Sequence, residues 1–252
     1  MSATDPAPTN TTLEKKLEDV KLADAPSQTQ PSSVTPSIKD KISGPRKLPI
    51  FEPPATIELP ATPVLTAEQQ SKYDTLLEEV KTWKEIPAAD GKGGSLKDSE
   101  IQWLTRECLL RYLRATKWVV ADSSKRLLDT LKWRREYGVE ELTADHVSPE
   151  GETGKEILLG YDNNGRPCHY LNPGRQNTDA SPRQVQHLVF MLERVIEVGI
   201  PGQEALALLI NFKTSKSRSY TAPGIGQGRE VLNILQTHYP ERLGRALIIN
   251  GK

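Results

Sequence analysis

The sequence predicts an α/β protein: an all-helical N-terminal lobe followed by an incomplete mixed β-sheet flanked by helices. Three patterns lead to this fold class. Residues 67–140 repeat apolar side chains at helical spacing, residues 157–171 form two short strand-like runs around a turn, and residues 205–250 read as strand, helix, strand. Two strands joined by one crossover helix are parallel, and a parallel sheet needs cover on both faces.

Residues 1–66 are expected to be disordered. They hold eleven of the nineteen prolines, among Ser, Thr and Lys, with almost no aromatic side chains. Such a segment buries too little apolar surface to offset the entropy lost on ordering. The remaining residues, 67–252, are numerous enough for one hydrophobic core.

The helical lobe is expected to contain three helices. The first begins at a capping box formed by Thr66 and Gln69, the second starts near Asp98, and the third runs from about Asp122 to Tyr137. Apolar residues at helical spacing predict the core of this lobe: Tyr73, Leu76, Leu77, Val80, Trp83, Leu104, Cys108, Tyr112, Ala115, Leu127, Leu128 and Leu131.

The sheet region, residues 141–252, is expected to begin with a β-hairpin. Its strands are Ile157–Tyr161 and Pro167–Leu171. Asn164-Gly165 between them can supply the positive φ angles of a type I′ turn.

A long helix follows the hairpin. Ser181 and Gln184 have capping-box spacing, and Pro182 occupies the first helical position. The helix is apolar on more than one side, which is typical of a helix buried between layers or lining an apolar cavity. Its main stripe consists of Val185, Leu188, Val189, Leu192, Val195 and Ile196.

The strand–helix–strand unit closes the readable pattern. Its strands are expected at Ala205–Phe212 and Ala246–Asn250, with a helix over about 228–239 between them. Both faces of the first strand are apolar, as in a covered parallel sheet.

Charge does not by itself select a partner. The chain is formally neutral, but residues 101–140 carry nine Lys or Arg against five Asp or Glu. Such a lobe could face anionic lipid or nucleic acid, and a solvated helix face explains it equally well. Nucleic acid is not expected, because no aromatic stacking motif is interleaved with the basic residues.

Catalysis, metals and cofactors are not expected either. The four histidines are scattered without metal-ligand spacing, and no nucleophile elbow or paired-carboxylate motif occurs. Glycines at 224, 226 and 228 resemble a phosphate-binding loop only weakly, because about eleven residues separate them from the preceding strand.

The compartment is expected to be the cytoplasm. The N-terminus lacks the basic and apolar runs of a signal peptide, and the longest apolar run is too short to span a bilayer. Two cysteines do not make a disulfide framework. The sequence gives no indication of oligomeric state.

Four segments stand out in order along the chain: Cys108–Trp118, Leu131–Gly138, Gly165–Pro167 and Tyr239–Gly244. Together they resemble the CRAL-TRIO lipid-transfer proteins, over about residues 98–250. Among these relatives the chain is most similar to fungal phosphatidylinositol transfer proteins of the subgroup linked to drug resistance and sterol homeostasis.

The resemblance implies a helical lobe and a sheet whose concave face, roofed by a mobile gate helix, holds one lipid. It implies lipid exchange at a membrane surface without bond chemistry. The apolar cavity replaces the bilayer, and each buried acyl methylene contributes about 0.8 kcal/mol.

The resemblance also implies site residues. Glu241 matches the acidic residue that helps bind inositol, and the helical stripe that includes Leu192 has a general lipid-binding role. Thr116 stands where a dual-specificity yeast relative has an arginine for the phosphoinositide. Four hydroxyl side chains that hold the choline lipid there fall in this chain at Leu158, His169, Leu206 and Leu208.

These four replacements argue against phosphatidylcholine and leave phosphatidylinositol as the expected ligand, with a sterol as a further candidate. The membrane would be a transient, peripheral partner. The family continues beyond the last strand with the gate helix and further elements, so the chain is expected to be truncated within its lipid-binding domain.

Three functions stay open at this stage. The first is non-enzymatic lipid transfer. The second is a module of the same fold that tethers a regulator to phosphoinositide membranes or a small GTPase. The third is an inactive truncated fragment, and an oxidoreductase is a distant enzyme alternative.

Overall fold

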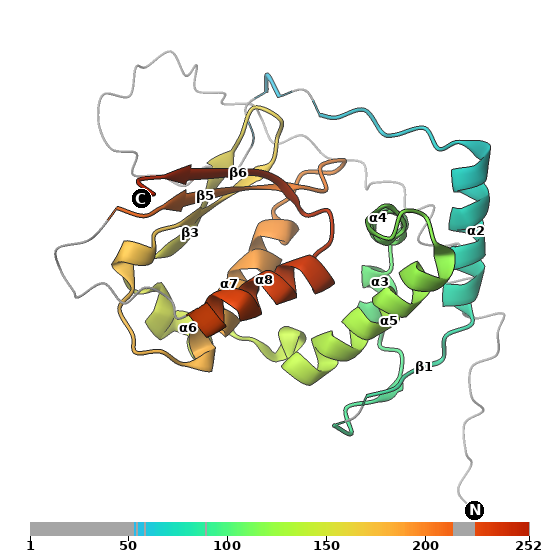
Figure 1. The fold of residues 1–252 in the computed structure, drawn as a ribbon, viewed down its shortest axis with the longest axis horizontal. Helices are drawn as coiled ribbons and strands as arrows, with labels where there is room; N and C mark the ends of the chain where they lie inside the picture. The colour runs from blue at the N-terminus through green and yellow to red at the C-terminus, as the bar shows by residue number, and fades with distance from the viewer. Residues whose placement is uncertain (1–52, 54, 58, 89, 214–224, 252) are drawn as a thin grey trace, which may run out of the picture. The chain divides into compact units, whose positions relative to one another are not determined.

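The computed structural model describes residues 53, 55–57, 59–88, 90–213 and 225–251. It has a mixed α/β fold, which confirms the predicted fold class (Figure 1). The helices are α2 (Ala67–Lys81), α3 (Asp98–Trp103), α4 (Arg106–Ala115), α5 (Val120–Tyr137), α6 (Ala144–Gly151), α7 (Pro182–Glu197) and α8 (Ile225–His238). The strands are β1 (Glu85–Ile86), β2 (Gly94–Ser95), β3 (Glu156–Tyr161), β4 (Pro167–Leu171), β5 (Leu206–Asn211) and β6 (Leu243–Ile249).

The predicted disorder of residues 1–66 falls mostly outside the described residues and stays a prediction. The described positions among 53–66 include no helix or strand. Two of them contact the folded part, because a Cβ added at Gly165 would come within 3.0 Å of Ile57 and 3.2 Å of Leu59.

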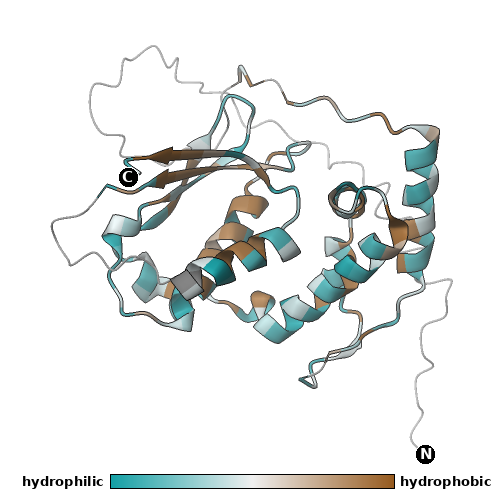
Figure 2. Ribbon diagram, viewed as in Figure 1, coloured by the Kyte–Doolittle hydropathy of each residue, from teal (hydrophilic) through white to brown (hydrophobic). Residues whose placement is uncertain are grey.

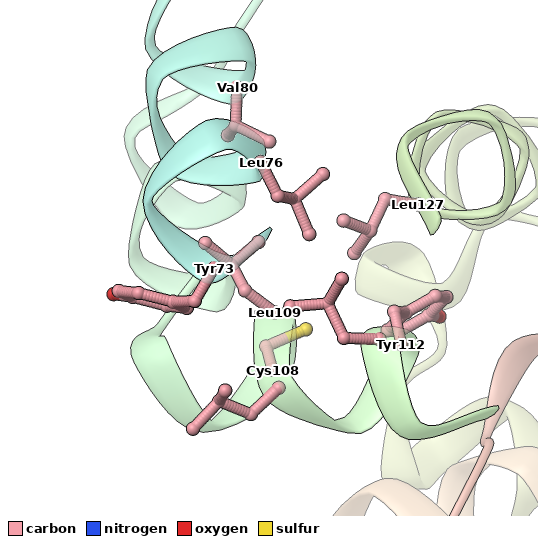
Figure 3. Packing of buried hydrophobic residues seen from close by; sticks show 9 residues of the cluster. Tyr73, Leu76, Val80, Cys108, Leu109, Tyr112 and Leu127 are labelled. Carbon is pink, nitrogen blue, oxygen red and sulfur yellow. The ribbon is translucent and has the colours of Figure 1, made fainter. Parts of the chain in front are cut away.

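The helical lobe has its own apolar core, built by α2, α4 and α5. Tyr73, Leu76 and Val80 of α2 face α4, and Leu127 of α5 completes the cluster (Figure 3). Helix α2 begins as predicted, with both hydrogen bonds of the capping box between Thr66 and Gln69 present.

The prediction of one helix beginning near Asp98 is wrong, because two helices occupy this stretch. Thr105 starts the second one: its backbone is extended, and its hydroxyl accepts the N–H of Cys108 at 3.2 Å. A threonine that caps the next helix in this way ends α3 at Trp103.

The predicted end of the third helix is confirmed. Gly138 caps α5 with a φ of 76°, in the left-handed region that glycine enters at no steric cost. Its N–H donates to the carbonyl of Arg134, one of the last carbonyls of the helix.

The hairpin β3–β4 is antiparallel as predicted, but its turn is not type I′. Among the turn residues, Gly165 has a positive φ of 74° and Asn164 does not. The N–H of Gly165 donates to the carbonyl of Asp162 at 3.0 Å, and the N–H of Asp162 donates to Arg166 at 2.9 Å. This is the longer hairpin loop in which a turn is followed by a left-handed glycine. The Asp162 carboxylate favours it by accepting the N–H groups of Asn164 and Arg166.

Helix α7 begins where predicted, but without the predicted capping box. Ser181 makes no side-chain cap, and its buried hydroxyl has no hydrogen-bond partner among the residues that the structure describes. The amide of Gln184 instead donates to the Thr178 and Asp179 carbonyls, 3.3 and 3.0 Å away. The Gln184 side chain, which the capping box would need, is therefore hydrogen-bonded to the loop before the helix.

The larger sheet has the strand order β3-β4-β5-β6, antiparallel at β3–β4 and parallel at the other two pairings. Helices α7 and α8 lie along one face of it (Figure 1). The glycines 226 and 228 that resemble a phosphate loop lie inside α8, and Gly224 lies outside the described residues.

Strand β6 is exposed along its whole length and, apart from Arg245, carries no charged side chain (Figure 2). Leu247, Ile248 and Ile249 are 49%, 61% and 56% exposed. Leu206 and Ala207 at the start of β5 are buried, as the sequence predicts for a covered parallel strand, whereas β6 forms an exposed edge.

No helix in the described part of the chain is both long enough and apolar enough to cross a membrane.

Candidate lipid-binding site

The layer between the sheet and helices α7 and α8 contains most of the residues that the sequence singles out. Strand register places His169 beside Leu158 on one side and Leu208 on the other. Because residues two apart on a strand share a face, Leu206 lies on that same face. The four positions that the resemblance assigns to the choline lipid are therefore brought together.

Helix α7 closes this layer from the opposite side. Leu192 packs in the same apolar cluster as Leu206, and the two side chains are 4% and 5% exposed. Valines of α7 and the α8 residue Ile234 fill the rest. Of the stripe predicted for α7, Leu188 and Ile196 are half-buried and the other four residues are buried.

His169 is the polar exception in this layer. Its Nε2 lies 3.3 Å from Glu156 Oε2, and His187 Nδ1 of α7 lies 3.5 Å from Glu156 Oε1. Both rings are almost fully buried. Burial alone would raise the pKa of Glu156, but the two neighbouring histidines hold it below its usual value. The sequence alone does not bring Glu156, His169 and His187 together, because they lie on three separate elements, β3, β4 and α7.

The apolar surface continues from this layer onto the open edge of the sheet. Leu208 and Ile210 are paired in register with Ala246 and Ile248, so these four residues face the same side as α7 and α8. Exposure increases along this surface, from half-buried Leu208 to Ile248, which is 61% exposed. An acyl chain laid against this face would bury that area.

Glu241 stands apart from the apolar layer, in the turn before β6. It has a positive φ of 60°, and its carboxylate lies 3.6 Å from the guanidinium of Arg114 in α4. Arg114 also pairs with Glu204 at 3.3 Å, and Arg111 pairs with the same carboxylate oxygen at 3.1 Å. A charged cluster therefore joins α4 to the strands, with Glu241 at its exposed end.

Thr116 does not supply the missing arginine charge. Its hydroxyl lies 3.0 Å from the carbonyl of Tyr112 and 2.6 Å from the hydroxyl of Ser123, so it closes the end of α4. The sequence could have indicated the charged cluster instead, because Arg111 and Arg114 are three residues apart on one helix face.

No group of three or more His, Cys, Asp or Glu among the described residues could hold a metal ion.

Comparison with known proteins identifies the family. The CRAL/TRIO domain matches residues 151–251, and the CRAL/TRIO N-terminal domain matches residues 72–129. The chain is 40% identical over 237 residues to the phosphatidylinositol transfer protein PDR17 of Saccharomyces cerevisiae. The match covers 86% of this chain and 67% of that protein. As the sequence resemblance predicts, the chain belongs to the CRAL-TRIO family.

Other known proteins are also similar to this chain. The chain is 57% identical over 188 residues to a CRAL-TRIO domain-containing protein of Schizosaccharomyces pombe; the match covers 74% of this chain but 18% of that protein. It is 28% identical over 205 residues to the SEC14 cytosolic factor of Kluyveromyces lactis, covering 74% and 63%. The crystal structure of Sfh5 is similar with a TM-score of 0.48 and 15% identity, covering 76% of this chain and 73% of that chain.

Proposed function

We propose that this protein binds lipid and transfers it between membranes without catalysing a reaction. The observation that carries the proposal is the apolar face shared by Leu206, Leu208, Ile210 and Ile248. It runs from a closed layer under α7 to an open surface, and apolar surface of this kind is where a protein takes up an apolar ligand. Membership of the CRAL-TRIO family supports the same function.

We propose phosphatidylinositol, with a sterol as a further candidate, rather than phosphatidylcholine. Leu158, Leu206 and Leu208 offer no hydrogen-bond donor to a headgroup phosphate. His169 lies against Glu156. Glu241 is an exposed carboxylate that can accept hydroxyl protons of an inositol ring. PDR17, a relative of this chain, is named as a phosphatidylinositol transfer protein.

The proposed domain organisation has two folded parts. Residues 67–140 would form the helical lobe, and residues 141–252 would form part of the lipid-binding domain. The protein would act in the cytoplasm, with transient and peripheral contact with membranes.

The test uses two adjacent isoleucines on opposite faces of one strand. Ile248→Asp places a carboxylate on the face shared with Leu208, whereas Ile249→Asp places it on the other face. Both side chains are exposed, at 61% and 56%, so the two variants should fold equally well. A charge against acyl carbons costs at least 1–2 kcal/mol, so Ile248→Asp should lower bound phosphatidylinositol about tenfold.

Bound lipid is measured by mass spectrometry of the purified chain, and transfer is measured between donor and acceptor vesicles. Equal loss in the two variants, or no lipid on the parent chain, would contradict the proposal. Membrane binding without transfer would indicate the tethering module instead. Neither lipid nor membrane binding by a folded chain would indicate an inactive fragment.

A further inference from the structure

A small cavity of about 60 Å³ lies where helices α3, α4 and α7 meet the turn after α8. It borders the apolar layer through Ile196 and Tyr239, and it is larger than one water molecule requires. The residues around it include Trp103, Arg111, Glu193, His238, Tyr239 and Arg242.

Two arginines of this cavity have hydrogen-bonding capacity to spare. Arg111, whose side chain is 6% exposed, donates from Nη1 to Glu204 Oε2 at 3.1 Å. Arg242 donates from Nη1 to the backbone carbonyl of Glu204 at 2.8 Å. A guanidinium has five N–H donors in a fixed fork, so each arginine keeps donors beyond these bonds.

The nearby carboxylates are already shared. Glu193 accepts two hydrogen bonds from Arg134, at 2.9 and 3.1 Å, and one from the Tyr239 hydroxyl at 2.6 Å. Glu204 is divided between Arg111 and Arg114. Within the described part of the chain, Arg242 forms no ion pair. The cavity wall therefore carries more positive than negative charge.

The electrostatics of Arg242 agree with this geometry. Burial, followed by the positive charge of Arg111, lowers the pKa of Arg242 to about 10. A partly buried cation that is repelled by its neighbour is stabilised by an anion placed between the two. An anionic ligand would therefore reduce the repulsion between Arg111 and Arg242.

We infer that this cavity binds a small oxyanion of the phosphate class between the guanidinium groups of Arg111 and Arg242. A tetrahedral oxyanion offers acceptor oxygens to two arginine forks at once, which is the geometry that arginine recognises best. The inference does not depend on the proposed lipid transfer. The same chemistry occurs in inorganic phosphate and in the phosphate of a lipid headgroup.

The test titrates the whole 252-residue chain with potassium phosphate, against potassium chloride at matched ionic strength. Trp103 lines the cavity, so its fluorescence reports occupancy alongside the midpoint of thermal unfolding. Phosphate should give a saturable change that chloride does not. Arg242→Lys keeps the charge but loses the fork, and should weaken phosphate binding at least about tenfold.

Arg111→Gln is the second variant, and Arg194→Gln is the matched control, because Arg194 is an exposed arginine on α7 paired with Glu197. Arg111→Gln should lose the phosphate response, whereas the control should keep it. An equal response to chloride, or an unchanged affinity in a folded Arg242→Lys variant, would overturn the inference.

A further arm separates the two sources of phosphate. The titration is repeated in the presence of vesicles that contain phosphatidylinositol or only phosphatidylcholine. Loss of the response with phosphatidylinositol alone would assign the site to the lipid headgroup, and persistence would assign it to free phosphate. Both results support an oxyanion site, and neither depends on the transfer assay.

Discussion

At the scale of single residues, Glu241 is the predicted site residue whose position best suits headgroup recognition. It is exposed, it precedes β6, and its only ion-pair partner among the described residues is Arg114 at 3.6 Å. A carboxylate in a loose ion pair can exchange that partner for ligand hydroxyl groups. Sequence resemblance alone pointed to this residue, whereas its neighbours Arg114 and Glu204 emerged from the structure.

We predict that Glu241→Gln lowers the affinity for phosphatidylinositol about tenfold and leaves any binding of phosphatidylcholine unchanged. A hydrogen bond to a charged acceptor contributes about 1.5–3 kcal/mol, part of which the neutral amide retains. Competition between the two lipids in the vesicle assay measures the ratio. Glu197→Gln, at an exposed carboxylate on α7, is the control. Equal losses for both lipids would contradict a headgroup role for Glu241.

His238 makes a second prediction, about pH. Its ring stacks on Trp133 with centroids 4.1 Å apart, and its Nδ1 lies 3.1 Å from the Thr130 hydroxyl. Burial, then the charge of Arg126, lowers the pKa of His238 to about 4 from 6.5. The folded state therefore binds this proton less readily than the unfolded state does. The stability that follows is present above pH 6.5 and is lost as the pH falls toward 4.

Between pH 7 and pH 5 the parent chain should lose about 1 kcal/mol more unfolding free energy than His238→Phe does, after allowance for partial solvent screening. Phenylalanine keeps the stacking on Trp133 and removes the titrating group. Denaturant unfolding at the two pH values measures the difference. Parallel losses in the two proteins would show that His238 does not titrate in this range.

At the scale of elements, the sequence correctly predicted helix ends where the residues that carry the signal also form the cap. The capping box at Thr66 and the helix end at Gly138 are such cases. Prediction failed where a nearby side chain had another partner. Gln184 bonds the loop before α7 instead of Ser181, and the Asp162 carboxylate holds the hairpin loop in a turn that is not type I′.

Gly138 gives the prediction that belongs to this scale. Gly138→Ala should destabilise the protein by about 1–2 kcal/mol, because φ at 76° is unfavourable for a residue with a Cβ. The added carbon would also lie 3.3 Å from Glu141 Oε2.

Gly226→Ala is the matched control for Gly138→Ala. Gly226 lies in α8, and a Cβ there meets nothing within 4 Å. Alanine is favoured over glycine in a helix by about 0.5–1 kcal/mol, so the control should stabilise the chain. Thermal unfolding of the two variants gives the comparison, and the same sign of change in both would refute the argument.

At the scale of the whole molecule, the helical lobe and the sheet region are joined by polar contacts between residues far apart in sequence. The Tyr112 hydroxyl donates to the carbonyl of His238 at 3.2 Å, and Arg126 Nε donates to the carbonyl of Thr237 at 3.1 Å. Arg134 reaches Glu193 on α7. No spacing rule links such residues, which explains why sequence analysis found the two regions but not the junction between them.

This junction should make the two regions unfold together. Each region carries its own probe: all four tryptophans lie in the helical lobe, and Cys168 is buried in β4. Urea unfolding followed by tryptophan fluorescence, and by modification of Cys168 read by mass spectrometry, should give one midpoint. Two separate midpoints in the parent chain would show that the regions unfold independently.

Glu193→Ala tests whether the junction contributes to stability in the way that its geometry implies. The change leaves Arg134, whose side chain is 11% exposed, without its carboxylate, and also leaves the Tyr239 hydroxyl unpaired. Removing one partner of a buried ion pair costs about 3–5 kcal/mol. Because the contact joins α5 to α7, both probes should shift to lower urea by the same amount. The control is Glu197→Ala, on the same helix but in an exposed pair with Arg194. It should lower the free energy of unfolding by less than about 0.5 kcal/mol, because exposed ion pairs contribute little. A loss confined to the tryptophan signal would place the role of Glu193 within the helical lobe rather than at the junction.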